Sequence, residues 1–194
     1  MNILVCDGRS RASLQIIRSL AAKNHTIFVG EAFFCTSFLS NRIFDKVYYP
    51  DPDKNADMFF DFICEYIRTK KIDFLIPVRD SSVKIFSKRK DELPFNCKVS
   101  CPDYKKMNIL NNKAELVKLA KSLNIPHPKT VFLENFADEK AVKAQLDFPI
   151  IAKPVHSSGS RGIKLINDNK DLNSFLEDKK VNNSSYILQE FIPH

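Results

Sequence analysis

The sequence predicts an α/β protein that begins with a parallel sheet and continues into a smaller α+β unit. In residues 1–104, short continuous apolar runs alternate with segments of helical periodicity, which is typical of βαβ units with helices on both sheet faces. From residue 105 onward, two apolar runs are joined only by a loop of small residues, which favours an antiparallel hairpin. The predicted domains are therefore residues 1–104 and 105–194.

The first domain contains five predicted strands with helices between them. The strands are continuous apolar runs at 2–6, 26–30, 46–49 and 74–78, with a weaker one at 95–99. The first helix follows Ser10, a plausible N-cap, and places Leu14, Ile17 and Ala21 on its buried side. Further helices are expected over roughly 55–70 and 81–90. Ligands of such sheets tend to sit beyond the carboxyl ends of the strands.

The second domain begins with a helical segment, 103–123, that has an expected break at residues 110–112. Its second part has an apolar stripe at helical spacing, formed by Leu116, Leu119, Ala120 and Leu123. The two prolines in 124–128 end this helix. Strands are then predicted at 130–133, 148–153, 163–166 and 186–192, with helices at 137–146 and 170–178.

Composition excludes several classes of protein. None of the apolar runs reaches the roughly 18 residues of a membrane helix, and the first residues lack the pattern of a signal peptide, so we expect a cytoplasmic protein that does not bind membranes. The formal charge of +7 is spread along the chain, which does not favour nucleic-acid binding. The five cysteines are scattered and are expected to be reduced; Cys97 and Cys101 lack metal-site spacing and a nearby histidine, so no metal site is predicted.

The segment 148–166 carries the most chemistry. A strand ends at Lys153, and a donor-rich loop leads into the next strand; the loop contains Ser157, Ser158, Gly159, Ser160, Arg161 and Gly162. Hydroxyls, loop amides and cationic side chains suit phosphate oxygens. The loop lacks the order of a P-loop, and Gly8 stands alone without a dinucleotide fingerprint. An ordinary surface hairpin with glycine at positive φ remains the alternative interpretation.

Two other features gain meaning from their order. Lys113 follows two asparagines at the start of a helix, and Gln189-Glu190 ends an apolar strand. Alone, these would be a solvated lysine and the polar positions of an edge strand. With Ile125-Pro126-His127-Pro128, Lys153-Pro154, Gly159-Ser160-Arg161-Gly162 and Gln189-Glu190-Phe191-Ile192-Pro193, the chain resembles the ATP-grasp superfamily. Within it, the resemblance is to carbamoyl-phosphate-synthase-like and carboxylate–amine ligases.

The resemblance implies a Rossmann-like pre-ATP-grasp domain over 1–104 and the first lobe of an ATP-grasp domain over 105–194. It implies that ATP phosphates contact Lys113, Lys153 and the loop, and that adenine binds the backbone of the strand that contains Gln189-Glu190-Phe191-Ile192-Pro193, which is the hinge strand of the family. The implied nucleotide-binding residues are Lys113, Lys153, Ser157, Ser158, Gly159, Ser160, Arg161, Gly162, Gln189, Glu190 and Ile192. The family's ribose-binding acid and Mg²⁺ ligands lie in a second lobe, which we expect outside this segment or on a partner chain.

The implied activity is ATP-dependent ligation: a small carboxylate becomes an acylphosphate, and an amine or ammonia then displaces phosphate. The resemblance identifies no catalytic residue in this segment, and without the second lobe the segment is expected to be inactive alone. The alternative is a nucleotide-binding or regulatory subunit that lacks its own magnesium ligands. Neither the carboxylate nor the nucleophile can be read from these residues.

Overall fold

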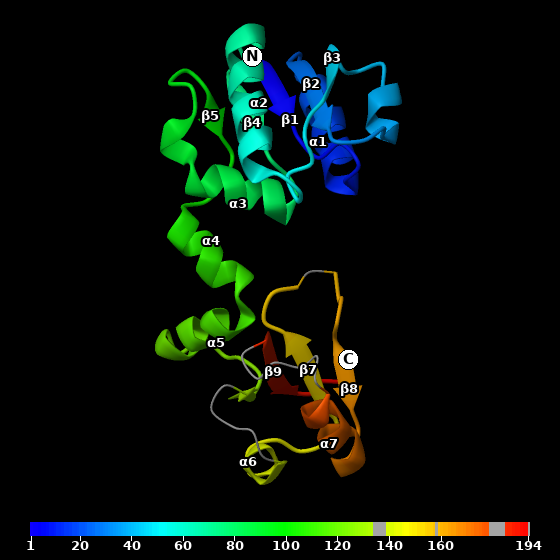
Figure 1. Cartoon of the computed structure of the whole chain (residues 1–194), viewed down its shortest axis with the longest axis vertical. Coiled ribbons are helices and arrows are strands. Elements are labelled where there is room, and N and C mark those ends of the chain that lie inside the picture. The colour runs from blue at the N-terminus through cyan, green and yellow to red at the C-terminus, as the bar shows by residue number, and fades with distance from the viewer. Residues whose placement is uncertain (134–138, 158, 179–184, 194) are drawn as a thin grey trace. The chain divides into compact units, whose positions relative to one another are not determined.

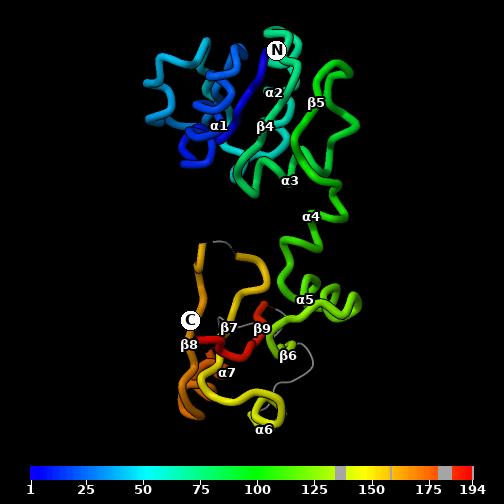
Figure 2. Tube along the Cα trace, turned by 180° about the vertical axis from the view of Figure 1, so that it is seen from behind, coloured from blue at the N-terminus to red at the C-terminus, as the bar shows by residue number. Residues whose placement is uncertain are grey.

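The computed structural model describes residues 1–133, 139–157, 159–178 and 185–193. The chain forms two compact units, Met1–Met107 and Asn108–His194 (Figures 1 and 2). None of the helices in the described ranges is long and apolar enough to span a bilayer.

The first unit is built on a five-stranded parallel sheet. Its strands are β1 (Asn2–Val5), β2 (Thr26–Glu31), β3 (Asp45–Tyr48), β4 (Phe74–Ile76) and β5 (Lys98–Val99), in the order β3-β2-β1-β4-β5. Its helices are α1 (Arg11–Ala21), α2 (Ala56–Lys70) and α3 (Asp80–Lys88), with short 3-10 turns η1 (Thr36–Leu39) and η2 (Lys90–Glu92). The predicted parallel sheet is confirmed, and most strand bounds agree within about two residues.

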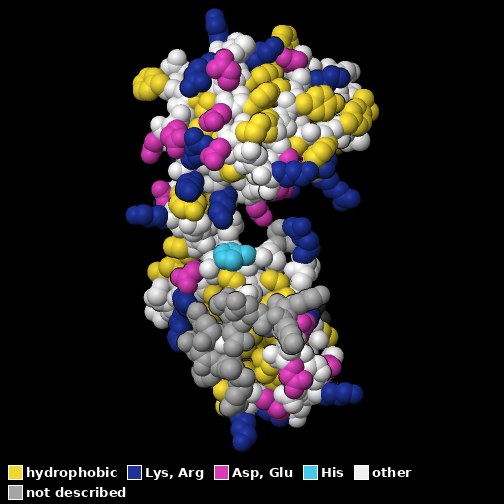
Figure 3. All heavy atoms as spheres, viewed as in Figure 1, with side chains coloured by type: hydrophobic (Ala, Val, Ile, Leu, Met, Phe, Trp, Pro, Cys, Tyr) yellow, Lys and Arg dark blue, Asp and Glu magenta, His cyan; other side chains and the backbone are white. Residues whose placement is uncertain are grey.

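Alternation along β1 explains why helices cover both faces of this sheet. Leu4 packs into a cluster with α2 and α3, including Phe59 and Phe86, whereas Ile3 and Val5 pack with Ile17 of α1. All of these side chains are buried. The part of this unit that carries η1 and β3 also exposes hydrophobic side chains (Figure 3); Phe34, Leu39, Phe44 and Tyr48 are more than half exposed.

The second unit contains a four-stranded antiparallel sheet. Helix α4 (Tyr104–Asn111) leads into it, followed by α5 (Lys113–Ser122), β6 (Thr130–Phe132), α6 (Glu139–Lys143), β7 (Ile150–Pro154), β8 (Lys164–Ile166), α7 (Asn169–Glu177) and β9 (Tyr186–Glu190). The strand order is β6-β9-β7-β8, and β7 and β8 form the predicted antiparallel pair. The sequence predicts a helix over 137–146. Residues 137 and 138 lie outside the described residues, and the described helix in this range is α6.

The two faces of this second sheet have different roles. One face packs against α6 and α7, where Ala152 and Leu188 meet Val142, Leu172 and Phe175 in a buried core. Lys153 and Gln189 point to the opposite face because side chains alternate along a strand. That face is therefore free of the helical core, and it carries the polar residues of interest.

The apolar stripe of α5 differs from its prediction. None of the residues of α5 is buried, and Leu116, Leu119 and Leu123 are 39%, 37% and 58% exposed. Leu116 and Ala120 instead line a cavity beside Lys153 and Gln189. Periodicity correctly located one apolar face of the helix, but that face borders a cavity instead of filling a core.

Candidate functional site

Lys113 is held at the start of α5 by backbone and cap contacts. The side chain of Asn112 accepts a hydrogen bond from the Glu115 amide (3.0 Å), which caps the helix. The Lys113 amide donates to the carbonyl oxygen of Val155 (3.1 Å), which fixes the helix start beside the end of β7. The asparagines at 111–112 thus both end α4 and begin α5, and they bring Lys113 to the sheet.

The Lys113 side chain contacts the loop that follows β7. Its Nζ donates to the backbone oxygen of Ser157 (2.7 Å) and lies 3.1 Å from the Ser157 hydroxyl. Lys113 and Ser157, both candidate residues, are therefore in direct contact. The neighbouring His156 lies with Nδ1 3.2 Å from the Asn111 oxygen, so its ring is engaged with the end of α4.

Lys153 and Gln189 form the second polar contact of the site. Lys153 lies on β7 and Gln189 on β9, and the register pairs Lys153 with Ile187 and Ile151 with Gln189. Their side chains share a face, and Lys153 Nζ donates to Gln189 Oε1 (2.7 Å). Gln189 is only 5% exposed, so its amide is a buried polar group that needs partners.

Both lysines line one cavity of about 390 Å³. Gln189 completes its polar wall, and α5, β9 and the segment after α5 supply the remainder. The lining residues are Lys113, Leu116, Val117, Ala120, Pro126, His127, Pro128, Lys153, Ile187 and Gln189. The sequence did not predict the apolar lining, although the stripe on α5 and the two prolines after it were recognisable signals.

The electrostatics of this cavity favour an anion. Burial, followed by the positive charge of Lys153, lowers the pKa of the Lys113 ammonium below its ordinary value of 10.5. Two cationic groups that repel each other across a partly desolvated space are stabilised when an anion binds between them. We call this the lysine cavity.

The described loop residues are not among those that line the lysine cavity, and Ser157 is connected to it through Lys113. Gly159, Ser160, Arg161 and Gly162 are exposed in the connection between β7 and β8, and Ser158 falls outside the described residues. Gly159, Ser160 and Gly162 have positive φ values of 63°, 59° and 74°. This backbone conformation is the one expected of a glycine-containing hairpin loop, so the geometry of the loop itself is compatible with either interpretation made from the sequence.

The residues at and after the end of β9 are not among those that line the lysine cavity. The Glu190 carboxylate accepts from the Lys129 amide (2.8 Å), and the Glu190 amide donates to the Lys129 carbonyl (3.1 Å). Glu190 and Phe191 line a separate cavity of about 150 Å³ with Phe148 and Pro149. Ile192 is 56% exposed. Glu190 and Ile192 are thus not brought to the lysine cavity by side-chain contact.

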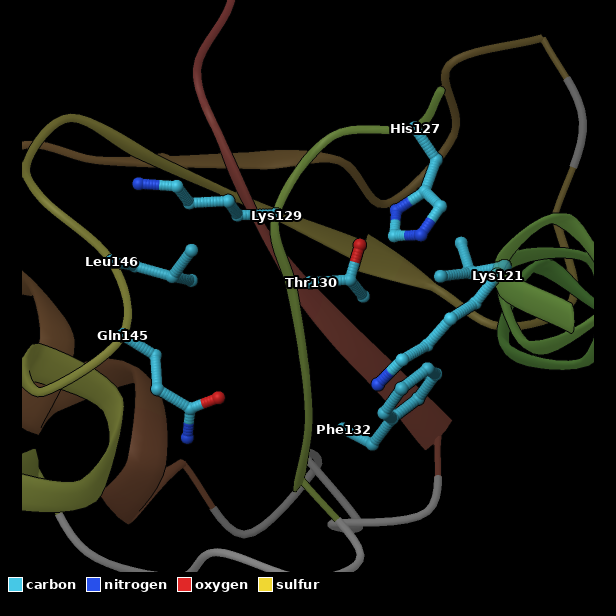
Figure 4. Close-up of a pocket in the computed structure, with 8 residues that line it drawn as sticks. Lys121, His127, Lys129, Thr130, Phe132, Gln145 and Leu146 are labelled. Carbon is cyan, nitrogen blue, oxygen red and sulfur yellow. The ribbon is translucent and has the colours of Figure 1, made fainter. Parts of the chain in front are cut away.

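A third cavity, of about 330 Å³, lies at the edge strand β6 (Figure 4). Helix α5 supplies Val117 and Lys121, the β6 segment supplies His127, Lys129, Thr130 and Phe132, and the turn after α6 supplies Gln145 and Leu146. Val117 and His127 also line the lysine cavity, so the two spaces flank the same segment.

The ligand position expected at the first sheet is occupied by the chain itself. Strand order changes direction between β1 and β4, where ligands of doubly wound sheets commonly bind. There, Oδ2 of the buried Asp7 accepts from the amides of Val78 and Arg79 (both 2.9 Å), and Oδ1 accepts from the Ser82 hydroxyl (2.8 Å). The donors that would cradle an anion are satisfied by this carboxylate.

The described residues contain no group of three His, Cys, Asp or Glu side chains placed to hold a metal ion. All five cysteines are free thiols, and four of them are buried.

Comparison with known sequences shows partial similarities. No family model matches this chain. A D-alanine–D-alanine ligase of Pseudomonas entomophila is 32% identical over 71 residues, which is 37% of this chain and 22% of that protein. A formate-dependent phosphoribosylglycinamide formyltransferase of Prochlorococcus marinus is 26% identical over 137 residues, covering 68% of this chain and 31% of that protein.

Comparison with solved structures covers nearly the whole chain. An L-amino acid ligase from Bacillus licheniformis matches with a TM-score of 0.72 and 12% identity, over 98% of this chain and 44% of that one. An N5-carboxyaminoimidazole synthetase from Staphylococcus aureus, complexed with ADP, matches with a TM-score of 0.72 and 15% identity, over 98% and 47%. The chain therefore has this fold and spans less than half the length of these structures.

Proposed function

We propose that this chain is a member of the ATP-grasp superfamily and forms the first part of the nucleotide site of an ATP-dependent ligase; its fold and its partial sequence similarities support this assignment. The similar proteins described above are all enzymes, among them ligases and a synthetase, so an enzymatic role is the general expectation. Beyond this general role, we propose which residues bind phosphate and which kind of substrate reacts.

One observation carries the proposal. Lys113 and Lys153 come from different elements, and both line a single cavity that Gln189 also lines. Ammonium groups form strong, charge-assisted hydrogen bonds with phosphate oxygens. Burial and, after it, the charge of Lys153 lower the pKa of Lys113, and a polyanion bound between the two ammonium groups would offset both effects. The apolar wall from α5 and Ile187 suits the uncharged part of a nucleotide, so the donor set and the lining fit ATP.

The chain's own residues would act by charge and position. Lys113 and Lys153 would neutralise phosphate oxygens, and the loop containing Ser157 would cover them and restrict water. In the proposed reaction a small carboxylate would attack the γ-phosphate of ATP to give an acylphosphate and ADP, and an amine or ammonia would then displace phosphate. We also propose that the chain is related to carbamoyl-phosphate-synthase-like enzymes, because its motifs follow the same order along the sequence.

The proposal assigns Mg²⁺ to ligands outside this segment. Phosphoryl transfer requires charge neutralisation beyond two lysines, which Mg²⁺ commonly supplies. We propose that a second lobe, on the same protein or on a partner chain, provides acidic ligands for the ion together with further substrate contacts. The binding of nucleotide phosphate by this segment is the part that can be tested directly.

The test is calorimetric titration of the 194-residue chain with ADP, with and without Mg²⁺. Lys113→Met and Lys153→Met should each weaken ADP binding by about tenfold or more, since each removes a charge-assisted contact. Lys170→Met is the matched control, because Lys170 is an exposed lysine on α7 of the same unit. Unchanged ADP affinity in both cavity variants would overturn the proposal.

A further inference from the structure

A chain of hydrogen bonds runs from Lys153 across three strands. Lys153 Nζ donates to Gln189 Oε1 (2.7 Å), Gln189 Nε2 donates to Thr130 Oγ1 (2.9 Å), and Thr130 Oγ1 donates to the Pro128 carbonyl oxygen (2.8 Å). The strands involved are β7, β9 and β6, which are neighbours in the sheet. This series of hydrogen bonds thus begins at the Lys153 ammonium in the lysine cavity and ends at the backbone oxygen of Pro128.

The direction of every hydrogen bond in this series is determined by its two ends, because the Lys153 ammonium only donates and the Pro128 carbonyl oxygen only accepts. A carbonyl oxygen only accepts, so the Thr130 hydroxyl must donate its single proton to Pro128. The Thr130 oxygen is then left with lone pairs alone and can only accept from Gln189. This requirement turns the Gln189 amide so that Nε2 faces Thr130 and Oε1 faces Lys153.

Reversal of the Gln189 amide would be unfavourable at both ends. Nε2 would then face the Lys153 ammonium, donor against donor, and Oε1 would face a hydroxyl whose proton is already engaged. Because Gln189 is 5% exposed, water has little access to satisfy either end. The Lys153 ammonium and the Thr130 hydroxyl therefore require the same orientation of the Gln189 amide, and Thr130 holds its Nε2 end in place.

Thr130 acts at a distance from any ligand of the lysine cavity. It is absent from the residues that line that cavity, whereas Lys153, Gln189 and Pro128 line it. It lines the neighbouring cavity at β6, with its hydroxyl pointing away from Gln145 and Phe132 (Figure 4). Thr130 reaches the lysine cavity through its two hydrogen-bond partners, Gln189 and Pro128, and Gln189 is the partner that bonds the Lys153 ammonium.

We propose that Thr130 is a positioning residue for anion binding: through Gln189 it holds the Lys153 ammonium in the orientation that meets a phosphate group. The inference that this matters for nucleotides rests on the proposed function. The inference that Thr130 orients Gln189 rests on the hydrogen bonds alone. The two parts can therefore fail separately.

The test compares Thr130→Val with Thr130→Ser in the 194-residue chain. Valine has nearly the shape of threonine but lacks the hydroxyl, whereas serine keeps the hydroxyl and lacks the methyl group. Thr130→Val should weaken ADP binding by about tenfold, the size expected for losing one oriented charge-assisted contact, and Thr130→Ser should remain within about twofold of the original chain. Ser122→Ala, which removes an exposed hydroxyl bonded to Leu119 on α5, is the control and should leave ADP binding unchanged.

A second readout does not require nucleotide. The Gln189 side-chain amide, assigned in NMR spectra by its loss in Gln189→Met, should exchange slowly with solvent in the original chain and in Thr130→Ser. In Thr130→Val its resonances should shift and its exchange should accelerate. Unaltered Gln189 resonances in Thr130→Val, or equal changes in the serine and valine variants, would overturn the positioning role. Absence of ADP binding by the original chain, with the NMR pattern as expected, would refute the proposed function and leave the orienting role of Thr130 established.

Discussion

Lys113 and Ser157 lie 44 residues apart in the sequence and are joined by the Lys113 ammonium, which donates to the Ser157 backbone oxygen at 2.7 Å. The contact ties the first residue of α5 to the loop after β7. It leaves the ammonium at the wall of the lysine cavity, where Lys153 also lies. A phosphate that binds there would compete with Ser157 for the protons of Lys113, so loop and ligand are linked through one side chain.

The first prediction concerns the pH dependence of ADP binding. An anion binds the protonated form of Lys113, so the dissociation constant should rise as pH rises through the pKa of this residue. Because burial and Lys153 lower that pKa, the rise should begin at lower pH than the ordinary lysine value of 10.5 implies. Calorimetric titrations across the alkaline range would measure it.

The matched variant for this prediction is Lys113→Arg. Arginine stays protonated throughout the accessible range, so the loss of affinity should move to higher pH. Identical pH profiles for the lysine and arginine forms would show that Lys113 does not contribute its charge to the bound state.

The second prediction concerns Asp7, which joins the ends of β1 and β4. Asp7→Ala removes the buried acceptors of two backbone amides and of the Ser82 and Tyr49 hydroxyls, and should lower the free energy of unfolding by about 3 kcal/mol or more. Asp7→Asn should cost less, because its remaining oxygen can still accept from the amides of Val78 and Arg79, while its NH₂ group faces the hydroxyl oxygens of Ser82 and Tyr49, which can accept. Asparagine also tolerates the positive φ of 60° at this position. Urea denaturation would check the order, and equal losses for the two variants would contradict this account.

The parallel sheet and the antiparallel hairpin were predictable because their signals are local. Continuous apolar runs such as 2–6 identify buried strands, and the short loop after Lys153 permits only a hairpin between β7 and β8. The strand order is less accessible, since the spacing of runs does not say which strand lies beside β1.

The candidate site was predictable in part, because the order of the motifs along the sequence indicated which residues to consider. Motif order suggested Lys113 and Lys153, and the structure places both at one cavity; their role with nucleotide stays a prediction. The amide orientation of Gln189 and the filling of the first sheet's edge by Asp7 depend on atoms from distant segments, which no local pattern contains. The exposure of Leu116 depends on what covers α5, and periodicity carries no information about that.

The third prediction uses two leucines of the second sheet. Leu188 on β9 is completely buried, whereas Leu165 on β8 is 51% exposed. Leu188→Ala should lower the free energy of unfolding of this unit by about 2–5 kcal/mol, since it removes transfer energy and leaves a cavity against Val131 and Phe175. Leu165→Ala should cost less than about 1 kcal/mol. Hydrogen exchange of amides in β7 and β9 would report the stability of this unit separately from the first, and comparable losses in the two variants would contradict the assignment of the core face.

The fourth prediction separates two glycines of the loop between β7 and β8. Both have positive φ, so alanine carries a backbone cost of about 1 kcal/mol at either position. At Gly162 an added Cβ would also lie 2.8 Å from Pro154 Cγ, next to Lys153, whereas at Gly159 nothing lies within 4 Å. Gly162→Ala should therefore disturb the end of β7 and weaken both stability and ADP binding, while Gly159→Ala should lose only the backbone cost of about 1 kcal/mol. Thermal unfolding together with ADP titration would measure both effects. A larger loss of stability at Gly159 than at Gly162 would mean that the loop takes another path in solution, because in the present geometry only Gly162 has a neighbour that a methyl group would strike.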